Sequence, residues 1–349
     1  MKVGILTGGG DCPGLNAVIR AVVTSARVTW GDATIGFLDG WRGVVDGDIV
    51  DLDVEVCRDI LHMGGTILGT SRTNPFALDG GADKVMGTLE LLGVEAMVVI
   101  GGDDTLGVGN RLGDLGAKVV GIPKTIDNDL AGTEVTFGFD TAVQIATDAI
   151  DRLRTTAESH HRVMVCEVMG RHVGWIATHA GIAGGAADIL VPEIPFDLDE
   201  VCERLRRRHD GGRFSSVLVV AEGAMPRGGR DLESAREATS SASVDQFGHA
   251  RLGGIGSWLS QEIERRTGFE SRFTTLGHIQ RGGTPTAFDR VLATRFGVEA
   301  VRAVHDGDFA KMVALRAGQI VRIPISEAVG KPKTVDVNLL HEVAGAFSD

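Results

Sequence analysis

The sequence predicts a doubly wound α/β fold, and three observations support this. Short apolar runs alternate with amphipathic stretches along most of the chain, which is typical of strands and helices that take turns in a parallel sheet. Segments rich in glycine and aspartate follow several of the apolar runs, where such sheets bind ligands. With 349 residues, 43% of them hydrophobic, the chain can fill the cores of two domains or the core of one large domain.

The elements follow from the apolar periodicity in chain order. The predicted strands are Val3 to Leu6, Ala96 to Ile100, Val119 to Ile122, Val163 to Val168 and Ser216 to Val220. The predicted helices are Asn16 to Ala26, Thr141 to Thr155 and Glu200 to Arg208. Pro226 to Gly254 is rich in Gly, Ser, Glu and Arg and predicts a surface insertion, a long solvated loop with room for a helix over Asp231 to Thr239.

Composition argues against several classes of function. The chain has 35 Lys plus Arg against 47 Asp plus Glu, a net charge of -12, which disfavours a nucleic acid or an anionic membrane as partner. Its four cysteines are scattered without a CxxC pair, so neither a zinc site nor a disulfide framework is indicated. The first apolar run is too short for a signal peptide, and no stretch reaches membrane-spanning length. We expect a cytoplasmic protein.

Two segments contain most of the residues that suit a catalytic site: GGDDT at residues 101–105 and PKTIDND at residues 123–129. Each follows a predicted parallel strand, so both should open at one edge of the sheet. They contribute four carboxylates and one lysine: Asp103, Asp104, Asp127, Asp129 and Lys124. Glycine lets backbone N–H groups approach a phosphate, and aspartate oxygens suit a hard cation. Together they predict a site for Mg²⁺, phosphate and a base, although either segment alone also fits an ordinary turn.

A third glycine-rich segment, GGGDCPG at residues 8–14, joins the first strand to a helix and can cradle an anion on its amides. A dinucleotide-binding fingerprint would need glycine where Pro13 stands, and a Walker A loop would need GK[ST] where Gly14-Leu15-Asn16 stands. The segment therefore indicates neither a dehydrogenase nor a P-loop ATPase.

Basic and polar groups gather further along the chain, at Arg162, MGR at residues 169–171, Glu222 and RFTTLGHIQRGG at residues 272–283. Arginine binds phosphate in a bidentate manner, and glutamate accepts hydrogen bonds from sugar hydroxyls. A phosphorylated sugar suits this set. Taken singly, each residue also fits a structural role, such as a surface ion pair, a buried histidine or a helix cap.

With GTSR ending at Arg72 and AEG at residues 221–223, these segments resemble, in order and spacing, the motifs of the phosphofructokinase family over nearly the whole chain. The resemblance implies two Rossmann-like doubly wound domains with the active site in the cleft between them. A phosphoryl-donor domain is expected at residues 1–138 plus about 280–330, and a sugar-phosphate domain at 139–279 plus about 331–349, with the insertion at about 226–254. A homodimer or homotetramer with shared sites is implied.

The resemblance also implies roles for the motif residues. Asp127 would take the proton from the 1-hydroxyl of fructose 6-phosphate, Thr125 and Asp129 would orient that hydroxyl and the metal shell, and Asp103 would organise Mg²⁺. Three groups would neutralise the phosphoryl group in transfer: Arg171, Arg72 and the Gly10 backbone. The sugar phosphate would be held by Met169, Gly170, Glu222, His278 and Arg281, with Arg162 and Arg272 from a neighbouring subunit.

The phosphoryl donor is decided at positions 104 and 124. ATP-using members of the family typically carry glycine at the place of Asp104, where the α-phosphate passes. A carboxylate there repels that phosphate by roughly 4 kcal/mol at about 4 Å and an effective dielectric near 20. Lys124 can pair with Asp104 and offers a cation to a compact anion. We therefore predict that pyrophosphate is the phosphoryl donor. Trp41 argues against this prediction, because its ring could stack on adenine.

Three alternatives stay open at this point. The chain could be an ATP-dependent 6-phosphofructokinase, or a kinase related to the lipid and NAD kinases, which share GGD-type loops but need neither MGR nor LGHIQRGG. It could also be a catalytically silent phosphate-binding or regulatory subunit, although Asp103, Thr125, Asp127 and Arg171 are all present. An assay with fructose 6-phosphate, Mg²⁺ and either donor separates these.

Overall fold

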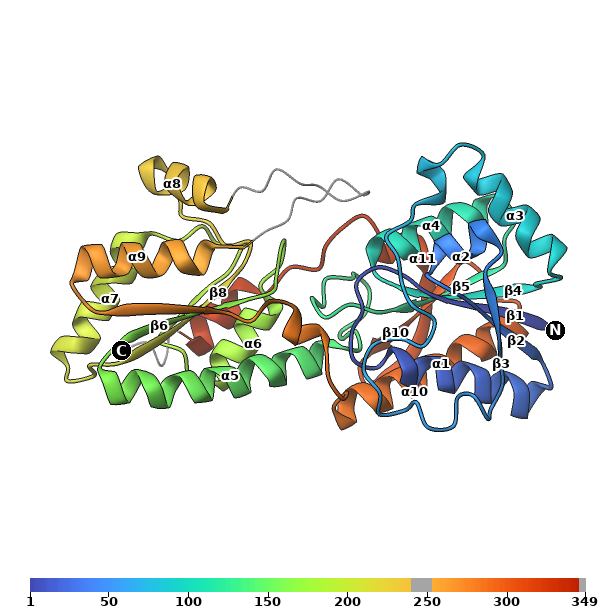
Figure 1. Cartoon of the computed structure of the whole chain (residues 1–349), viewed down its shortest axis with the longest axis horizontal. Helices are drawn as coiled ribbons and strands as arrows, with labels where there is room; N and C mark the ends of the chain where they lie inside the picture. The colour runs from blue at the N-terminus through green and yellow to red at the C-terminus, as the bar shows by residue number, and fades with distance from the viewer. Residues whose placement is uncertain (240–252, 345–349) are drawn as a thin grey trace. The chain divides into compact units, whose positions relative to one another are not determined.

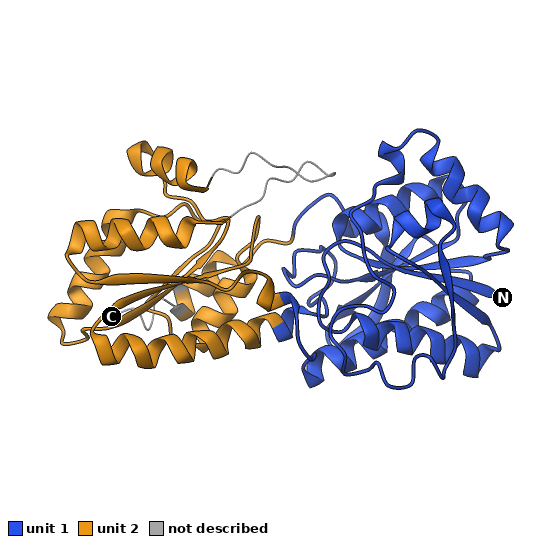
Figure 2. Cartoon of the chain, in the orientation of Figure 1, with its two compact units in different colours: residues 1–141, 245–248, 281–332 blue, residues 142–244, 249–280, 333–349 orange. Residues whose placement is uncertain are grey.

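The computed structural model describes residues 1–239 and 253–344, and the chain divides into two compact units (Figure 2). Unit 1 contains Met1–Thr141 and Arg281–Pro332. Unit 2, as described, contains residues 142–239, 253–280 and 333–344. The chain thus begins unit 1, builds most of unit 2, and returns to complete unit 1.

In the described part of unit 1, seven strands form one sheet. In spatial order they are β11 (Gln319–Pro324), β10 (Lys311–Arg316), β5 (Val119–Pro123), β4 (Ala96–Gly101), β1 (Lys2–Thr7), β2 (Ala33–Phe37) and β3 (Ile49–Leu52). The five inner strands are parallel, and the two edge strands are antiparallel to their neighbours. The chain winds from β1 to one side through β2 and later to the other side through β4. The switch point at β1 and β4 is where such sheets bind ligands.

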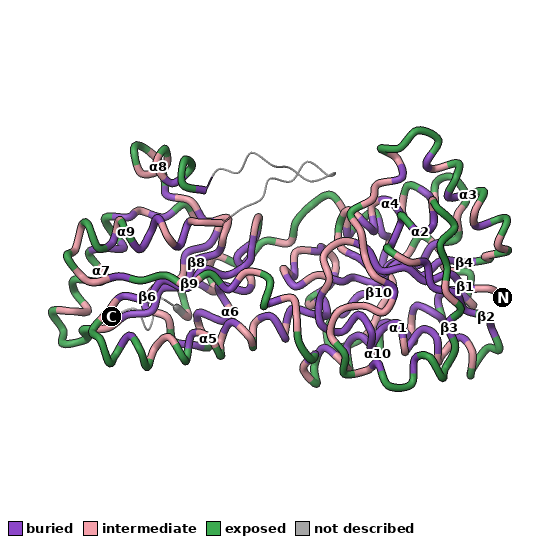
Figure 3. The backbone as a smooth tube through the Cα atoms, viewed as in Figure 1, coloured by how far each residue is buried: buried purple, intermediate pink, exposed green. Residues whose placement is uncertain are grey.

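Helices cover both faces of this sheet, which is why its inner strands are continuous apolar runs. One face carries α1 (Leu15–Thr24) and α10 (Ala287–His305), and the other carries α2 (Trp41–Asp46), α3 (Gly81–Leu91), α4 (Asp103–Asp114) and α11 (Ile325–Ala328) (Figure 1). All six residues of β4 are buried, and the inner strands are buried along most of their length in Figure 3. The buried sheet holds its carboxyl edge as a rigid platform.

Unit 2, as described, has a sheet of four parallel strands. Their spatial order is β7 (Asp188–Leu190), β8 (Ser216–Ala221), β6 (Val163–Val168) and β9 (Ser271–Thr275). The longer helices are α5 (Phe139–His160), α6 (Trp175–Ala183), α7 (Leu198–Asp210), α8 (Gly229–Thr239) and α9 (Ile255–Thr267). Val165, Leu218 and Trp258 belong to one apolar core between the sheet and its helices. Short segments complete the chain: Ser25–Trp30, Pro75–Ala77, Gly277–Arg281, α12 (Val337–Leu339) and Leu340–Ala344.

The structure confirms the doubly wound fold and each predicted strand and helix. The predicted helix Asn16 to Ala26 crosses a junction, because α1 ends at Thr24 and the chain continues as a π-helical segment over Ser25–Trp30. The predicted insertion is more than a solvated loop at its start. There α8 packs on α9, with Ala235 fully buried and the Trp258 indole N–H donating to Ser234 Oγ at 2.9 Å. Residues 240–252 of the insertion lie outside the described residues.

The four cysteines are buried and free. Within residues 1–239 and 253–344, no helix combines the length and apolar character needed to cross a bilayer.

Asp289 on α10 is a fully buried carboxylate that anchors the first turn of α5. It accepts hydrogen bonds from the Thr141 N–H at 2.8 Å and the Thr141 hydroxyl at 2.5 Å. Burial nevertheless raises the pKa of Asp289 from 3.8 to about 6. The folded protein therefore favours the protonated carboxyl, and this contribution to stability is present below about pH 4 and lost as the pH rises through 6.

We therefore expect the free energy of unfolding to depend on pH through Asp289. Between pH 4 and pH 7, the parent should lose about 2 kcal/mol relative to an Asp289→Asn variant, which cannot ionise. Urea unfolding of both proteins across this pH range measures the difference. Parallel curves for the two proteins would show that the Asp289 carboxyl titrates normally.

Candidate active site

The turn after β1 brings backbone and two cations together at Gly10. Gly8 N–H donates to the Ile100 carbonyl at 2.9 Å, which ties the turn to the end of β4. Lys124 Nζ donates to the Gly10 carbonyl, and a Cβ atom at residue 10 would overlap with Arg281 Nη1. Any larger residue at position 10 would therefore push this arginine away. The structure thus places Gly10, Lys124 and Arg281 side by side within unit 1.

Arg72 is held next to the same turn by its neighbours. Gly9 N–H donates to the Ser71 carbonyl at 3.2 Å, and Thr70 Oγ1 donates to the Gly9 carbonyl at 2.6 Å. Arg72 itself is exposed. The structure thus places an exposed arginine beside the glycine turn, and guanidinium groups are good partners for phosphate.

GGDDT forms the start of α4 rather than a free loop. Gly102 is the residue before the helix, and Asp103 and Asp104 lie in its first turn, where the helix dipole favours negative charge. Asp103 is exposed and Asp104 half-buried. Asp103 Oδ1 accepts a hydrogen bond from Gly330 N–H at 2.7 Å. The backbone thus fixes both carboxylates at the carboxyl end of β4.

PKTIDND is a tightly bonded loop after β5. Asp127 N–H donates to Thr125 Oγ1 at 3.0 Å. Asn128 has a φ of 53°, in the left-handed region, and its Oδ1 accepts from Thr136 N–H at 3.1 Å. Thr136 Oγ1 in turn donates to the Thr125 carbonyl at 2.7 Å. The asparagine therefore sets the shape of the loop that carries Thr125, Asp127 and Asp129.

The two segments do meet at one sheet edge, because β4 and β5 pair in parallel with Gly101 opposite Pro123. Their carboxylates sense one another: the pKa of Asp129 is raised to about 6 by burial, and then by the charges of Asp127 and Asp103. Burial and the nearby Arg281 lower the pKa of Lys124, whose side chain is only 3% exposed. The edge thus juxtaposes a negative group and a positive group.

Carboxylates that lie close together and repel one another offer the oxygen ligands that Mg²⁺ prefers. Within the described ranges, no three His, Cys, Asp or Glu side chains are close enough to hold a metal ion by themselves. A magnesium ion at this edge would need further oxygens, which a bound phosphate would supply. The residues therefore fit an ion that arrives with a phosphate.

Trp41 is not placed to stack on a nucleotide base. Its side chain is 2% exposed and belongs to the apolar core of unit 1. Its indole N–H donates to the Thr105 carbonyl at 3.2 Å, so the ring lies beneath the start of α4. Trp41 was the feature of the sequence that argued against pyrophosphate, and the structure shows that it is a core residue.

The carboxyl edge of the unit 2 sheet gathers the MGR segment, Glu222 and His278. Met169–Arg171 follow β6, Glu222 follows β8, and His278 lies in the turn after β9. Glu222 N–H donates to the Val168 carbonyl at 2.9 Å. Gly170 has a φ of 142°, and its carbonyl accepts from Gly223 N–H at 3.0 Å. These bonds hold Met169, Gly170, Arg171 and Glu222 along one edge.

Gln280 joins this edge together, a role that the sequence analysis did not assign. It is fully buried. Its Oε1 accepts from Met169 N–H at 3.3 Å and its Nε2 donates to the Gly277 carbonyl at 3.0 Å. The signal in the sequence was a polar residue between Ile279 and Arg281 in a motif already singled out.

Arg162 and Arg272 lie at the opposite end of the same strands. Arg162 directly precedes β6, whereas Met169 directly follows it, and Arg272 pairs with Met164 near the start of β9. At about 3.3 Å per residue the two ends of β6 are roughly 20 Å apart. One copy of unit 2 therefore does not bring these arginines to Met169, Glu222 and His278.

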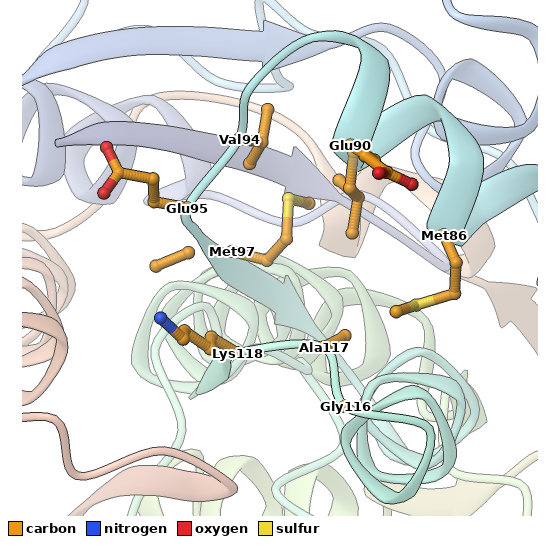
Figure 4. A pocket seen from close by; sticks show the side chains of 10 residues that line it. Met86, Glu90, Val94, Glu95, Met97, Gly116, Ala117 and Lys118 are labelled. Atoms are coloured by element: carbon orange, nitrogen blue, oxygen red, sulfur yellow. The ribbon is translucent and has the colours of Figure 1, made fainter.

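A pocket of about 300 Å³ opens at the amino-terminal edge of the unit 1 sheet. Figure 4 shows Met86, Val94 and Met97 around it, with Glu95 and Lys118 also on its wall. It lies where β4 begins, whereas the predicted site lies where β4 ends. None of the predicted site residues lines this pocket.

The fold and its edges first define a class: a two-unit α/β protein whose strand ends carry carboxylates, a buried lysine and arginines, as phosphoryl transfer requires. Residues 2–304 match the family Phosphofructokinase, and the chain belongs to this family.

The chain is 59% identical to pyrophosphate–fructose 6-phosphate 1-phosphotransferase of Streptomyces coelicolor, over 99% of this chain and 100% of that protein. It is 53% identical to ATP-dependent 6-phosphofructokinase 3 of the same organism, over 96% of both chains. Among solved structures, Pichia pastoris phosphofructokinase in the T-state superposes with a TM-score of 0.81 at 31% identity, covering 99% of this chain and 36% of that one.

Proposed function

We propose that the protein transfers a phosphoryl group from pyrophosphate to the 1-hydroxyl of fructose 6-phosphate, giving fructose 1,6-bisphosphate and phosphate in glycolysis or gluconeogenesis. The observation that carries the choice of donor is Asp104 in the first turn of α4, together with buried Lys124 at the Gly10 carbonyl. A carboxylate at position 104 disfavours a nucleotide, and a buried cation suits a compact anion. The relative at 59% identity is named for pyrophosphate, and the one at 53% for ATP.

The two sheet edges divide the work. In unit 1, the donor domain, Lys124, Arg72 and the backbone at Gly10 bind pyrophosphate. In unit 2, the sugar-phosphate domain, the binding residues are Met169, Gly170, Glu222 and His278. Arg281, which belongs to unit 1, is the further residue proposed to bind the sugar phosphate. Arg171 neutralises charge on the phosphoryl group as it moves, since such transfer depends on positioning and charge rather than covalent chemistry.

Asp127 acts as the general base on the 1-hydroxyl. Its backbone N–H bond to Thr125 Oγ1 fixes the carboxylate in the loop, and Asp129 lies close enough for the two charges to interact. A hydroxyl that gives its proton to Asp127 becomes the nucleophile, while Thr125 and Asp129 orient it. Mg²⁺, held by Asp103 and by phosphate oxygens, would neutralise the negative charge of the donor.

A donor comparison tests this function. Protein mixed with fructose 6-phosphate and Mg²⁺ is supplied with pyrophosphate or ATP, and fructose 1,6-bisphosphate is measured. Pyrophosphate should support the larger kcat/KM. A larger value with ATP would replace the proposed donor, and no product with either would point to the silent-subunit alternative. Buried free cysteines fit a reducing compartment, so we propose that the reaction takes place in the cytoplasm.

We further propose a homodimer or homotetramer with shared sites, because Arg162 and Arg272 lie at the far end of β6 and β9 from the other sugar-phosphate residues. Complementation tests this. An Asp127→Ser protein and an Arg162→Gln protein, each nearly inactive, are unfolded together, refolded and assayed. If each site takes these residues from different copies, random assembly restores about a quarter of the sites. No recovery would mean that each copy supplies its own arginine.

A further inference from the structure

A compact charge cluster lies at the amino-terminal edge of the unit 2 sheet. Arg162 precedes β6, and Glu270 and Arg272 stand on either side of Ser271, the first residue of β9. The Glu270 carbonyl accepts a hydrogen bond from Val163 N–H at 3.0 Å. The parallel pairing of β6 with β9 therefore fixes Glu270 beside Arg162.

One carboxylate oxygen holds both arginines. Arg162 Nη2 lies 2.8 Å from Glu270 Oε1, and Arg272 Nη2 lies 2.6 Å from the same atom. Arg162 first, and then Arg272 and His160, lower the pKa of Glu270. The three side chains of this bridge are 29% to 52% exposed, so a solute can reach them. Two guanidinium groups thus converge on a single anionic oxygen.

We propose that Glu270 is an internal competitor for the phosphate of the sugar. In the free protein its carboxylate occupies guanidinium donors that phosphate would use, and binding displaces it. This inference rests on the proposed function, which assigns Arg162 and Arg272 to the sugar phosphate. A phosphate dianion offers three oxygens and can engage both guanidinium groups in a bidentate manner, whereas the carboxylate uses one oxygen for both.

The remaining contacts of Arg272 favour competition over simple support. Its Nη1 already donates to the Ser271 carbonyl at 2.7 Å and approaches Glu264 Oε2 at 3.5 Å. The side chain is therefore held from its own strand, and Glu270 is not needed to position it. Glu270 is the carboxylate that contacts both guanidinium groups, whereas Glu264 approaches only Arg272 at 3.5 Å, so neutralising Glu270 frees both arginines and leaves a net positive charge that attracts an anion.

Glu270→Gln tests the proposal, with Glu264→Gln as the matched control, because Glu264 contacts Arg272 and the Ser271 N–H from the same edge. On the full chain we measure the Kd for fructose 6-phosphate by calorimetry and its KM with pyrophosphate. Glu270→Gln should lower both about three- to tenfold, the effect of releasing two exposed ion pairs. The kcat should change less than twofold, and Glu264→Gln should change each quantity less than twofold.

Two further measurements, at varied ionic strength and in a double variant, test whether the effect depends on charge and on Arg162. The gain in Glu270→Gln should shrink as ionic strength rises and should disappear when Arg162→Gln is added. Weaker binding in Glu270→Gln, or a change equal to that of the control, would show that Glu270 supports the arginines instead. Glu270→Asp, whose shorter side chain keeps the charge, should give an intermediate gain and serves if the glutamine variant does not fold.

Sulfate titration separates this inference from the proposed function, because a tetrahedral dianion needs no catalysis. Sulfate should bind Glu270→Gln more tightly than the parent by a similar factor, and that gain should also need Arg162. If sulfate binding shows this gain but the parent transfers no phosphoryl group, the proposed function is wrong and the inference about Glu270 still holds. If the parent transfers phosphoryl groups normally but Glu270→Gln binds sulfate no more tightly than the parent, the proposed function holds and the inference about Glu270 is wrong.

Discussion

Replacing Asp127 with serine is expected to lower kcat by roughly a thousandfold, within the range that a positioned general base contributes. Serine cannot take the proton of the 1-hydroxyl, although Thr125 and Asp129 remain to orient it. The KM for fructose 6-phosphate should change much less, because Asp127 is not among the residues proposed to bind the sugar phosphate. Steady-state assay with pyrophosphate measures both constants.

The fold of this variant should be intact. Asp127 raises the pKa of Asp129, so removing its charge relieves a repulsion, and the variant should unfold at the same temperature as the parent or higher. Asp127→Asn is the matched variant, since it keeps the shape and removes only the base. A kcat near that of the parent in either variant would remove Asp127 from the mechanism.

Much of the fold was predictable because its inner strands are buried on both faces. Such strands are mostly apolar runs, as β4 is and as β6 is apart from the buried Glu167, and a run of that kind is visible in the sequence. β9 was not predicted. It lies at the edge of its sheet, four of its five residues are polar, and Arg272 and Phe273 are exposed. An edge strand depends on its neighbour for pairing, and periodicity does not reveal the neighbour.

The candidate site also has parts that the sequence predicts and parts that it does not. Gly10 and the aspartates of unit 1 were predictable, because loops after parallel strands must share one edge. The contact between Gly10 and Arg281 joins positions 271 residues apart, and no local pattern encodes it. Trp41 shows the opposite error: an aromatic residue near a predicted site suggested a base-stacking surface, but its ring fills the core under α4. Burial of a single aromatic side chain depends on packing.

Glu270 was missed because acidic residues beside arginines in sequence are usually solvated. Its importance comes from the register of β6 and β9, which brings Arg162 within 2.8 Å of a residue 108 positions away. The sequence motif contains the arginines that would bind phosphate, but only the strand pairing shows which anion holds them in the free protein.

The double change Asp104→Gly with Lys124→Gly is expected to exchange the donor. Pyrophosphate loses the cation buried beside Gly10, so its kcat/KM should fall about a hundredfold. ATP loses a repulsion of up to roughly 4 kcal/mol before screening by Mg²⁺ and salt, so its kcat/KM should rise at least about tenfold. Parallel assays with both donors at saturating fructose 6-phosphate measure the exchange.

Single variants separate charge from space in this exchange. Asp104→Asn keeps the volume of the side chain and removes its charge, whereas Asp104→Gly removes both. If repulsion excludes ATP, asparagine should allow most of the gain. If the side chain blocks the α-phosphate, only glycine should. Because Lys124 and the nearby carboxylates of Asp11 and Asp129 are unchanged in both variants, pyrophosphate use should persist in both. A donor preference unchanged by the double variant would place selectivity elsewhere in the chain.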